Sequence, residues 1–272
     1  MKDYFGKDAS CLNQKKLFLF DMDGTIYLDN DLFDGTKQLL EKIEKAGGKY
    51  VFITNNSSKS VSDYVAKLHR LGLNQVNENH FFTSAQATLD LLNEKHKNHK
   101  IYVQGTNSLV AEYKKSGLNI TTEYADDIDV VLVAFDPEFT GEKVYTTCKV
   151  LTKNNQVSYY ATNPDWVCPV EFGYIPDCGS MCQSYYRATG KMPQFIGKPQ
   201  PTMVYSAMKK FGFSKEQTVV IGDRLYTDIA SGNNAGVTTV CVLSGEVNLT
   251  DVNNASGAEV PDFVFNSVKD LV

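Results

Sequence analysis

Short apolar segments alternate with amphipathic helical segments along most of this 272-residue chain. Residues 16–20 and 49–53 are apolar runs, and residues 36–46 between them carry apolar side chains at helical spacing before Gly47 and Gly48, a helix stop. Fully apolar strands joined by amphipathic helices are typical of a parallel sheet that is covered on both faces. The pattern therefore predicts an α/β fold whose ligands bind beyond the carboxyl ends of the strands.

The alternation continues to near the C-terminus. A capping-box pattern at Ser60 and Asp63 predicts the start of a further helix, and others are expected over residues 107–115 and from Gly141. Further apolar runs occupy residues 101–103, 130–134, 157–161, 194–196, 218–221 and 238–243. Roughly eight strands are too many to assign to one sheet from the pattern alone.

Charge and composition exclude several classes of protein. The formal charge of −5 and the absence of a basic run argue against nucleic acid as a partner. No apolar stretch approaches the roughly 20 residues that cross a bilayer, and the N-terminal segment lacks the apolar centre of a signal peptide. We therefore expect a cytoplasmic protein without a membrane partner. The six cysteines show no CxxC pair, so reduced structural thiols are expected.

Two carboxylates follow the first apolar run. Asp21 and Asp23 are one residue apart and precede Gly24, whose backbone freedom permits a tight turn that brings them into one pocket. Carboxylates packed closely repel each other unless a cation lies between them, and an oxygen-rich site favours Mg²⁺. An ordinary Asp-Gly turn is the alternative interpretation of this segment alone.

Three further predicted strand ends carry polar residues. Residues 54–58 offer hydroxyls, amides and backbone N–H groups before a helix start, which suits a phosphate. Lys198 follows a third strand, and Asp223 and Asp228 follow a fourth. Taken singly, these residues fit a helix cap, a surface lysine and loop carboxylates. Taken together at four strand ends, they predict one pocket for a phosphate and a divalent cation.

These residues resemble the motifs of the haloacid dehalogenase-like phosphohydrolases, over about residues 17–249. The specific pair is Asp-x-Asp-Gly-Thr at residues 21–25 and Gly-Asp-x-x-x-x-Asp at residues 222–228. Residues 161–165, 197–199 and 243–245 resemble in particular the branch with NagD nucleotidase, 4-nitrophenylphosphatases and pyridoxal phosphate phosphatase. The resemblance implies a Rossmann-like parallel sheet core with helices on both faces and an inserted α/β cap domain.

The resemblance implies a role for each residue of the pocket. Asp21 would attack phosphorus and form an aspartyl phosphate, and Asp23 would protonate the leaving alkoxide and then activate water. An ordinary carboxylate is ionised at neutral pH and needs no helper base, whereas Asp23 must arrive protonated, a state that low solvent access and a charged neighbour would favour. Thr54 and Asn55 would bind the phosphoryl oxygens, and Lys198 would neutralise charge on the phosphoryl group and the nucleophile.

The resemblance also implies a Mg²⁺ site. Its ligands would be the carboxylate of Asp21, the backbone carbonyl of Asp23 and the carboxylate of Asp223. Asp228 would act through a metal-bound water or orient Lys198. The ion and the lysine together bring three positive charges to a pocket in a net-acidic protein.

The spacing of the motifs places the cap domain between the second motif, at residues 54–58, and the third, at Lys198. About 28 residues separate Thr25 from Thr54, too few for a lid domain, whereas about 140 separate Ser58 from Lys198. We expect residues 1–83 and 181–272 to form a discontinuous core and residues 84–180 to form the inserted cap. A mobile cap would exclude water and contact the leaving group. Dimers formed through the cap are expected from the resemblance.

The segment that leads from cap to core contains candidates for substrate contact. Asp165 is the first of them, although a turn is an equal alternative for any residue there. Trp166, the only tryptophan, could stack on an aromatic substrate or fill the cap interior, and we favour the interior. The pyridoxal phosphate phosphatases carry a histidine where this chain has Cys168 before Pro169, which argues against that substrate.

The predicted function is a Mg²⁺-dependent phosphatase of small phosphorylated metabolites, such as sugar phosphates, nucleoside monophosphates or 4-nitrophenyl phosphate. A phosphotransferase or phosphomutase could use the same Asp21, with a sugar hydroxyl in place of water as acceptor. A receiver-like phospho-acceptor without turnover is the non-enzymatic alternative, but such domains need only about 120 residues. Lys198 is followed by Pro199 and not by Ser or Thr, so the segment is not a Walker A motif.

Overall fold

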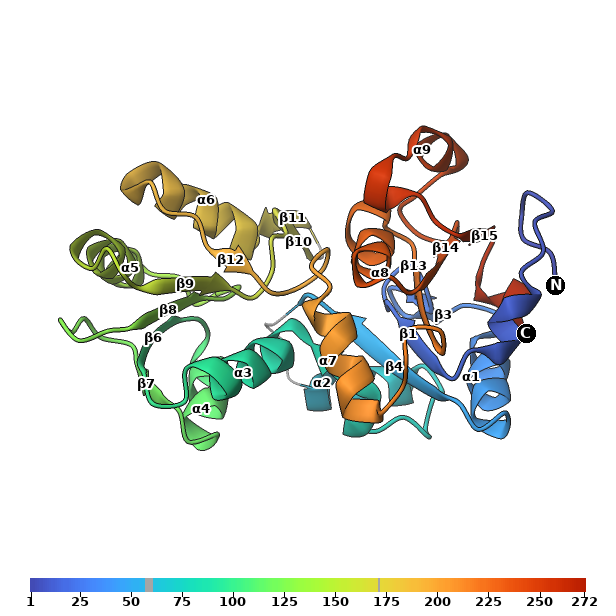
Figure 1. Cartoon of the computed structure of the whole chain (residues 1–272), viewed down its shortest axis with the longest axis horizontal. Coiled ribbons are helices and arrows are strands. Elements are labelled where there is room, and N and C mark those ends of the chain that lie inside the picture. Colours follow the sequence, from blue (N-terminus) through green and yellow to red (C-terminus); the bar gives the residue numbers. More distant parts are fainter. Residues whose placement is uncertain (57–60, 171) are drawn as a thin grey trace. The chain divides into compact units, whose positions relative to one another are not determined.

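The computed structural model describes residues 1–56, 61–170 and 172–272. The chain divides into two compact units: residues 1–54, 61–82 and 198–272 form the first, and residues 55–60 and 83–197 form the second. Each unit is built on its own parallel sheet with helices beside it (Figure 1). The expected strands are therefore shared between two sheets.

The first unit is organised around a six-stranded sheet in the order β15-β14-β13-β1-β4-β5. Neighbours from β15 to β4 run parallel. The central strands are almost entirely buried, as expected for a sheet covered on both faces. Its strands are β1 (Leu17–Phe20), β4 (Lys49–Thr54), β5 (Phe81–Thr83), β13 (Thr218–Gly222), β14 (Thr238–Val242) and β15 (Phe263–Phe265), and a separate hairpin joins β2 (Tyr27–Leu28) to β3 (Asp31–Leu32).

The helices of the first unit bury an apolar stripe. In α1 (Thr36–Lys45), Leu39, Leu40 and Ile43 are buried, and Gly47 adopts a φ of 71° just beyond the helix, as the glycine stop predicted. The others are α2 (Val61–Arg70), α7 (Thr202–Phe211), α8 (Ala230–Ala235) and α9 (Leu249–Asn254), with the π-helical turn η3 (Leu225–Ile229). The capping box expected at Ser60 lies outside the described residues.

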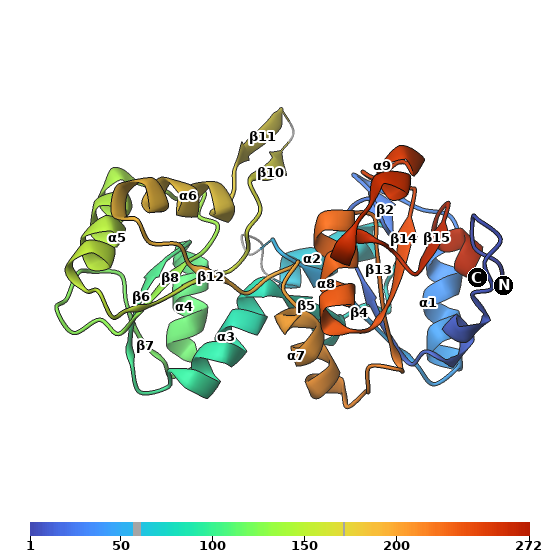
Figure 2. The same ribbon diagram turned by 45° about the horizontal axis from the view of Figure 1, so that its top comes forward.

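The second unit contains a five-stranded, fully parallel sheet in the order β12-β9-β8-β6-β7. Its strands are β6 (Lys100–Gln104), β7 (Asn119–Thr121), β8 (Val130–Val133), β9 (Ser158–Ala161) and β12 (Gln194–Phe195), and its helices are α3 (Ser84–Lys95), α4 (Asn107–Lys115), α5 (Gly141–Lys153) and α6 (Cys178–Thr189). An antiparallel hairpin of β10 (Val167–Val170) and β11 (Gly173–Pro176) lies apart from this sheet and projects from the unit (Figure 2).

The second unit extends further along the chain than residues 84–180. The strand β12 pairs with β9, so the segment from α6 through β12 belongs to the second unit, which ends at Gly197. The apolar run at residues 194–196 resembled a core strand because β12 is short and ends only a few residues before Lys198 of the first unit. Short apolar runs do not reveal which sheet they join.

No helix in the described part of the chain combines the length and the apolar character needed to cross a membrane.

Candidate active site

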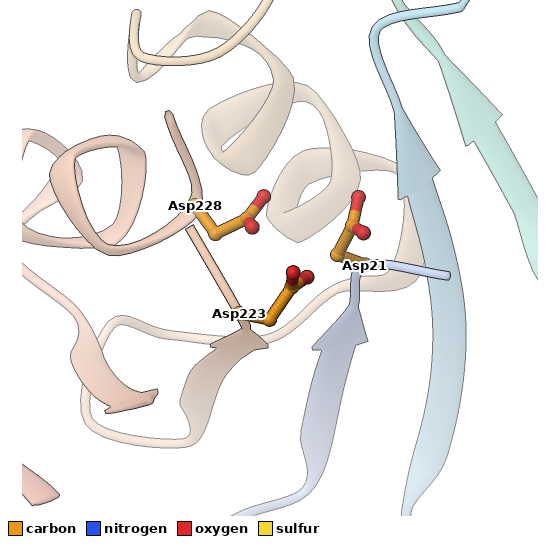
Figure 3. Close-up of side chains that lie close together, drawn as sticks. All are labelled: Asp21, Asp223 and Asp228. Carbon is orange, nitrogen blue, oxygen red and sulfur yellow. The ribbon is translucent and has the colours of Figure 1, made fainter. Parts of the chain in front are cut away.

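Three carboxylates of the first unit converge at the ends of neighbouring strands. Asp21 follows β1 and Asp223 follows β13, and these two strands pair in parallel so that the Asp21 N–H donates to the Ile221 carbonyl at 2.9 Å. Asp228 is presented by η3. A ligand oxygen from each of Asp21, Asp223 and Asp228 lies within 4.8 Å of the others, and the three side chains point toward one another (Figure 3).

Lys198 lies among these carboxylates. Its Nζ donates to Asp21 Oδ1 and to Asp228 Oδ1, each at 2.6 Å, and to the Ile53 carbonyl at 3.3 Å. The residue is 3% exposed. Burial lowers the pKa of Lys198, but the two carboxylates outweigh burial and raise it above its usual value. The side chain is therefore a fixed cation that bridges two of the three carboxylates.

The remaining negative charge is not balanced within the cluster. Burial, followed by the charge of Asp21, raises the pKa of Asp223 to about 6. Burial raises the pKa of Asp228 to about 7, with Asp21 and Asp223 adding to the effect and Lys198 opposing it. Three convergent carboxylate oxygens with excess negative charge fit a hard divalent cation such as Mg²⁺.

Glycines allow the backbone to approach the carboxylates closely. Gly24 adopts a φ of 83°, and a Cβ there, or at Gly245, would collide with Asp223 Oδ2. A Cβ at Gly222 would collide with Asp228. Gly24 therefore has two functions: it permits the turn after Asp23, and it leaves room for the side chain of Asp223.

Asp23 lies outside the carboxylate cluster. Its Oδ2 accepts a hydrogen bond from the Tyr27 hydroxyl at 3.1 Å, and its Oδ1 is 3.6 Å from Lys67 Nζ. The side chain is 56% exposed. The expectation of low solvent access at Asp23 is therefore wrong for this structure, because the turn after β1 directs the side chain toward Tyr27 and Lys67.

Thr54 and Asn55 fall in different units. Thr54 is buried at the end of β4 in the first unit. Asn55 belongs to the second unit, where its Nδ2 donates to Asp165 Oδ1 at 3.1 Å and its carbonyl accepts from Ser84 Oγ at 2.7 Å and Asn163 Nδ2 at 3.0 Å. The structure thus brings together Asn55 and Asp165, two residues that the sequence placed in separate motifs.

Trp166 is exposed and not part of the interior of the second unit. Its exposed fraction is 61%, so the prediction that it fills the core is wrong. It directly precedes the β10–β11 hairpin, which carries the exposed residues Phe172 and Tyr174. Cys168, within β10, is buried.

Sequence reasoning missed four polar residues that lie close to the predicted site residues. Tyr27 and Lys67 contact Asp23, while Arg224 and Glu246 form an ion pair with 2.8 Å between Arg224 Nε and Glu246 Oε2. Arg224 directly follows Asp223 and could have been found from that position. Nothing in the sequence spacing indicates the other three.

Two family models match the chain. The model described as haloacid dehalogenase-like hydrolase matches residues 18–119, and a second, HAD-hydrolase-like model matches residues 195–271. Together they include both carboxylate motifs and Lys198. They confirm the resemblance that the motifs indicated.

Individual relatives are similar over most of their length. An acid sugar phosphatase from Staphylococcus aureus is 32% identical over 96% of this chain and 98% of its own. The crystal structure of a 4-nitrophenylphosphatase from Thermotoga maritima matches with a TM-score of 0.88 and 37% identity over 96% of this chain and 97% of its own. A glycerol phosphate phosphatase from Mycobacterium tuberculosis, solved in complex with magnesium, matches with a TM-score of 0.88 and 27% identity over 100% of this chain and 79% of its own.

Proposed function

The chain belongs to the haloacid dehalogenase-like hydrolases, and we propose that it is a Mg²⁺-dependent phosphatase that hydrolyses small phosphomonoesters through an aspartyl phosphate. The observation that carries the proposal is the buried cluster of Asp21, Asp223 and Asp228 bridged by Lys198. The relatives named for sugar, glycerol and 4-nitrophenyl phosphates support a small phosphomonoester as the substrate class.

In the proposed reaction Asp21 is the nucleophile. One of its carboxylate oxygens bonds to phosphorus as the bond from phosphorus to the ester oxygen breaks, and Lys198 holds Oδ1 in place. Thr54, the last residue of β4, and Asn55, which follows it, would donate hydrogen bonds to the phosphoryl oxygens. Lys198 also offsets negative charge on the transferring group.

Asp23 is the proposed acid and base. It gives a proton to the departing alkoxide, then takes a proton from the water that attacks the aspartyl phosphate, so that phosphate is released and Asp21 is regenerated. Asp23 is exposed and lies 3.6 Å from Lys67 Nζ, so it can exchange protons directly with solvent.

The proposed Mg²⁺ site consists of the carboxylates of Asp21 and Asp223 and the backbone carbonyl of Asp23. Asp228 would act through Lys198, to which it is hydrogen-bonded at 2.6 Å, or through a metal-bound water. When bound, the ion neutralises charge that develops on the phosphoryl oxygens. The unbalanced charge of the three carboxylates supports a cation at this position.

The second unit is the proposed cap domain. It is inserted between the first and last carboxylate motifs, and Asn55 and Asp165, which are hydrogen-bonded within it, are the proposed substrate contacts. The exposed Trp166 is available for contact with an aromatic leaving group. Dimerisation through this unit is also proposed, on the family resemblance alone.

Phosphate release from a panel of phosphorylated metabolites, with Mg²⁺ and with a chelator, tests the proposal. The panel should contain sugar phosphates, glycerol phosphate, nucleoside monophosphates and 4-nitrophenyl phosphate. We expect release only with the metal and multiple turnovers per enzyme. Transfer to a sugar hydroxyl without net phosphate release would instead indicate a phosphotransferase, and a stable acyl phosphate without turnover would indicate a receiver-like acceptor.

A further inference from the structure

Two loops of the first unit meet beside Asp223. One is the segment that follows β13, residues 223–226, and the other follows β14, residues 244–247. The Val247 N–H donates to the Asp223 carbonyl at 3.3 Å, and Ser244 Oγ donates to the Gly24 carbonyl at 2.8 Å. The loop after β14 is therefore attached to both carboxylate motifs.

Both oxygens of Asp223 accept hydrogen bonds inside this junction. The Thr25 hydroxyl donates to Oδ1 at 3.0 Å, and the Glu246 backbone N–H donates to Oδ2 at 2.8 Å. Asp223 is 1% exposed, so few alternative orientations are open to it. The position of the Glu246 backbone thus helps to fix how Asp223 faces the other carboxylates.

The Glu246 side chain is itself anchored to the segment after Asp223. Oε2 accepts from Arg224 Nε at 2.8 Å, and Oε1 accepts from the Tyr226 hydroxyl at 3.1 Å. One residue therefore contacts the Asp223 segment at three points, once by its backbone and twice by its side chain. The Glu246 side chain is 51% exposed, and its two directed hydrogen bonds link the loop after β14 to the segment after β13.

Arg224 gives this link an electrostatic function as well. Burial lowers the pKa of Arg224, but the charges of Asp21, Asp228, Asp223 and Glu246 raise it above its usual value. The guanidinium therefore lies within the field of the whole carboxylate cluster. Apart from Glu246, the charges that raise the pKa of Arg224 are those of Asp21, Asp228 and Asp223, the three residues of the carboxylate cluster.

We propose that Glu246 is a positioning residue for the divalent cation: it fixes Asp223 through its backbone N–H and retains Arg224 on its side chain, away from the carboxylate cluster. The inference rests on the proposed function and deepens it, because it assigns metal affinity to a residue that is not a ligand. Loss of a group that orients a metal ligand lowers metal affinity or activity by about 10- to 100-fold in other proteins.

Calorimetric titration of Mg²⁺ into the metal-free protein tests the assignment. Glu246→Ala removes both side-chain bonds, and we expect its affinity for Mg²⁺ to fall by about tenfold. Glu246→Gln keeps one acceptor oxygen, so a smaller loss is expected. At saturating Mg²⁺ both variants should keep kcat within about twofold of the wild type, with an unchanged KM for the ester, because no contact to the reacting atoms is removed.

Glu259→Gln is the matched control. Glu259 is exposed and lines the same cavity of about 380 Å³ as Glu246 and Arg224. The substitution Glu259→Gln removes one negative charge, as Glu246→Gln does. It should bind Mg²⁺ as the wild type does. An equal loss in Glu259→Gln and Glu246→Gln would assign the effect to the general field and overturn the proposal.

The remaining outcomes separate this inference from the proposed function. Wild-type Mg²⁺ affinity in both Glu246 variants, or a large fall in kcat at saturating metal, would overturn the positioning role while leaving a Mg²⁺-dependent phosphatase intact. A wild-type protein that neither binds Mg²⁺ nor releases phosphate would overturn both. If Glu246→Ala does not fold, as judged by its thermal unfolding, Glu246→Gln alone decides.

Discussion

Both units are built on a parallel sheet, but their buried carboxylates differ in the partners that surround them. In the first unit, Asp21, Asp223 and Asp228 converge on one another and share a single buried lysine. In the second, Asp136 is fully buried and has its own partner, with 2.8 Å between its Oδ2 and Lys143 Nζ, and its other oxygen accepts the Glu138 N–H at 3.0 Å. In the first arrangement three carboxylates share one lysine, which supports the proposed metal site, whereas in the second the single carboxylate has its own lysine.

A raised pKa alone does not distinguish the two units. Asp177, which caps α6 by accepting the Cys178 N–H, has a pKa raised to about 7 by burial, with Asp165 adding to the effect. Within the described ranges, the one group of three convergent metal-type ligands is nevertheless in the first unit. Convergence of carboxylates, rather than the burial of any one of them, therefore indicates the site.

The largest effect is expected from Asp21→Asn. An amide cannot form the acyl phosphate, so turnover should fall by a thousandfold or more, on the order of losses for other catalytic nucleophiles. The thermal unfolding temperature and the circular dichroism spectrum should stay near those of the wild type. Near-wild-type rates in this variant would refute the nucleophile assignment.

Asp23→Asn should separate substrates by their leaving groups. An alkoxide needs a proton, so loss of the acid should slow the first turnover of a sugar phosphate by about 100-fold or more. The 4-nitrophenolate group leaves readily without a proton and should be slowed much less. Rapid-quench measurement of the first turnover on both substrates gives the comparison, and equal losses would count against Asp23 as the acid.

The contrast between the units also explains what the sequence could predict. The motifs around Asp21 and Asp223 follow buried strands that pair directly, so local pattern and strand order suffice to bring them together. Lys198 was correctly placed with Asp21 although its preceding strand, β12, belongs to the other sheet. Sheet membership depends on long-range pairing, which short apolar runs do not encode.

Other features depend on side-chain directions that only the fold determines. The exposed position of Asp23 follows from a turn that points it at Tyr27 and Lys67, and the exposure of Trp166 follows from its place beside a hairpin outside the sheet. Glu246 joins Arg224 across 22 positions of sequence, without any repeated spacing. Such contacts are invisible to local patterns.

Asp136→Asn tests the buried pair of Asp136 and Lys143 in the second unit. It removes one charge of a buried pair whose lysine is partly exposed, so we expect a loss of about 2 kcal/mol in the free energy of unfolding. The phosphatase rate of the folded protein should stay within about twofold of the wild type, since Asp136 does not belong to the carboxylate cluster. Chemical denaturation and initial rates are the two measurements. A collapse of kcat with intact stability would reverse the roles that we assign to the two carboxylate arrangements.

The smallest effect concerns pH. In the metal-free fold the pKa of Asp223 is raised to about 6 and that of Asp228 to about 7, from the ordinary value of 3.8 that applies in the unfolded chain. At a pH between these values the folded protein therefore holds protons that the unfolded chain has lost. The contribution of these two carboxyl groups to the free energy of unfolding is fully present below their unfolded-state pKa of 3.8, and it is lost as the pH rises through 6 to 7. Mg²⁺ needs ionised carboxylates, so the rise in Tm that it causes should be small at pH 5 and larger, by a few degrees or about 1 kcal/mol, at pH 8.

Thermal unfolding across this pH range, with and without Mg²⁺, provides the check, and Asp136→Asn serves as the control because its pair lies in the other unit. A metal-induced shift that is independent of pH would mean that the titrating carboxylates are not those that receive the metal.

Direct titration of Mg²⁺ into the metal-free wild type, Asp223→Asn and Asp136→Asn tests most directly whether convergent carboxylates make the first unit a metal-dependent site. We predict one Mg²⁺ per chain in the wild type and in Asp136→Asn, and no measurable binding in Asp223→Asn. Wild-type binding in Asp223→Asn, or its loss in Asp136→Asn, would contradict the account.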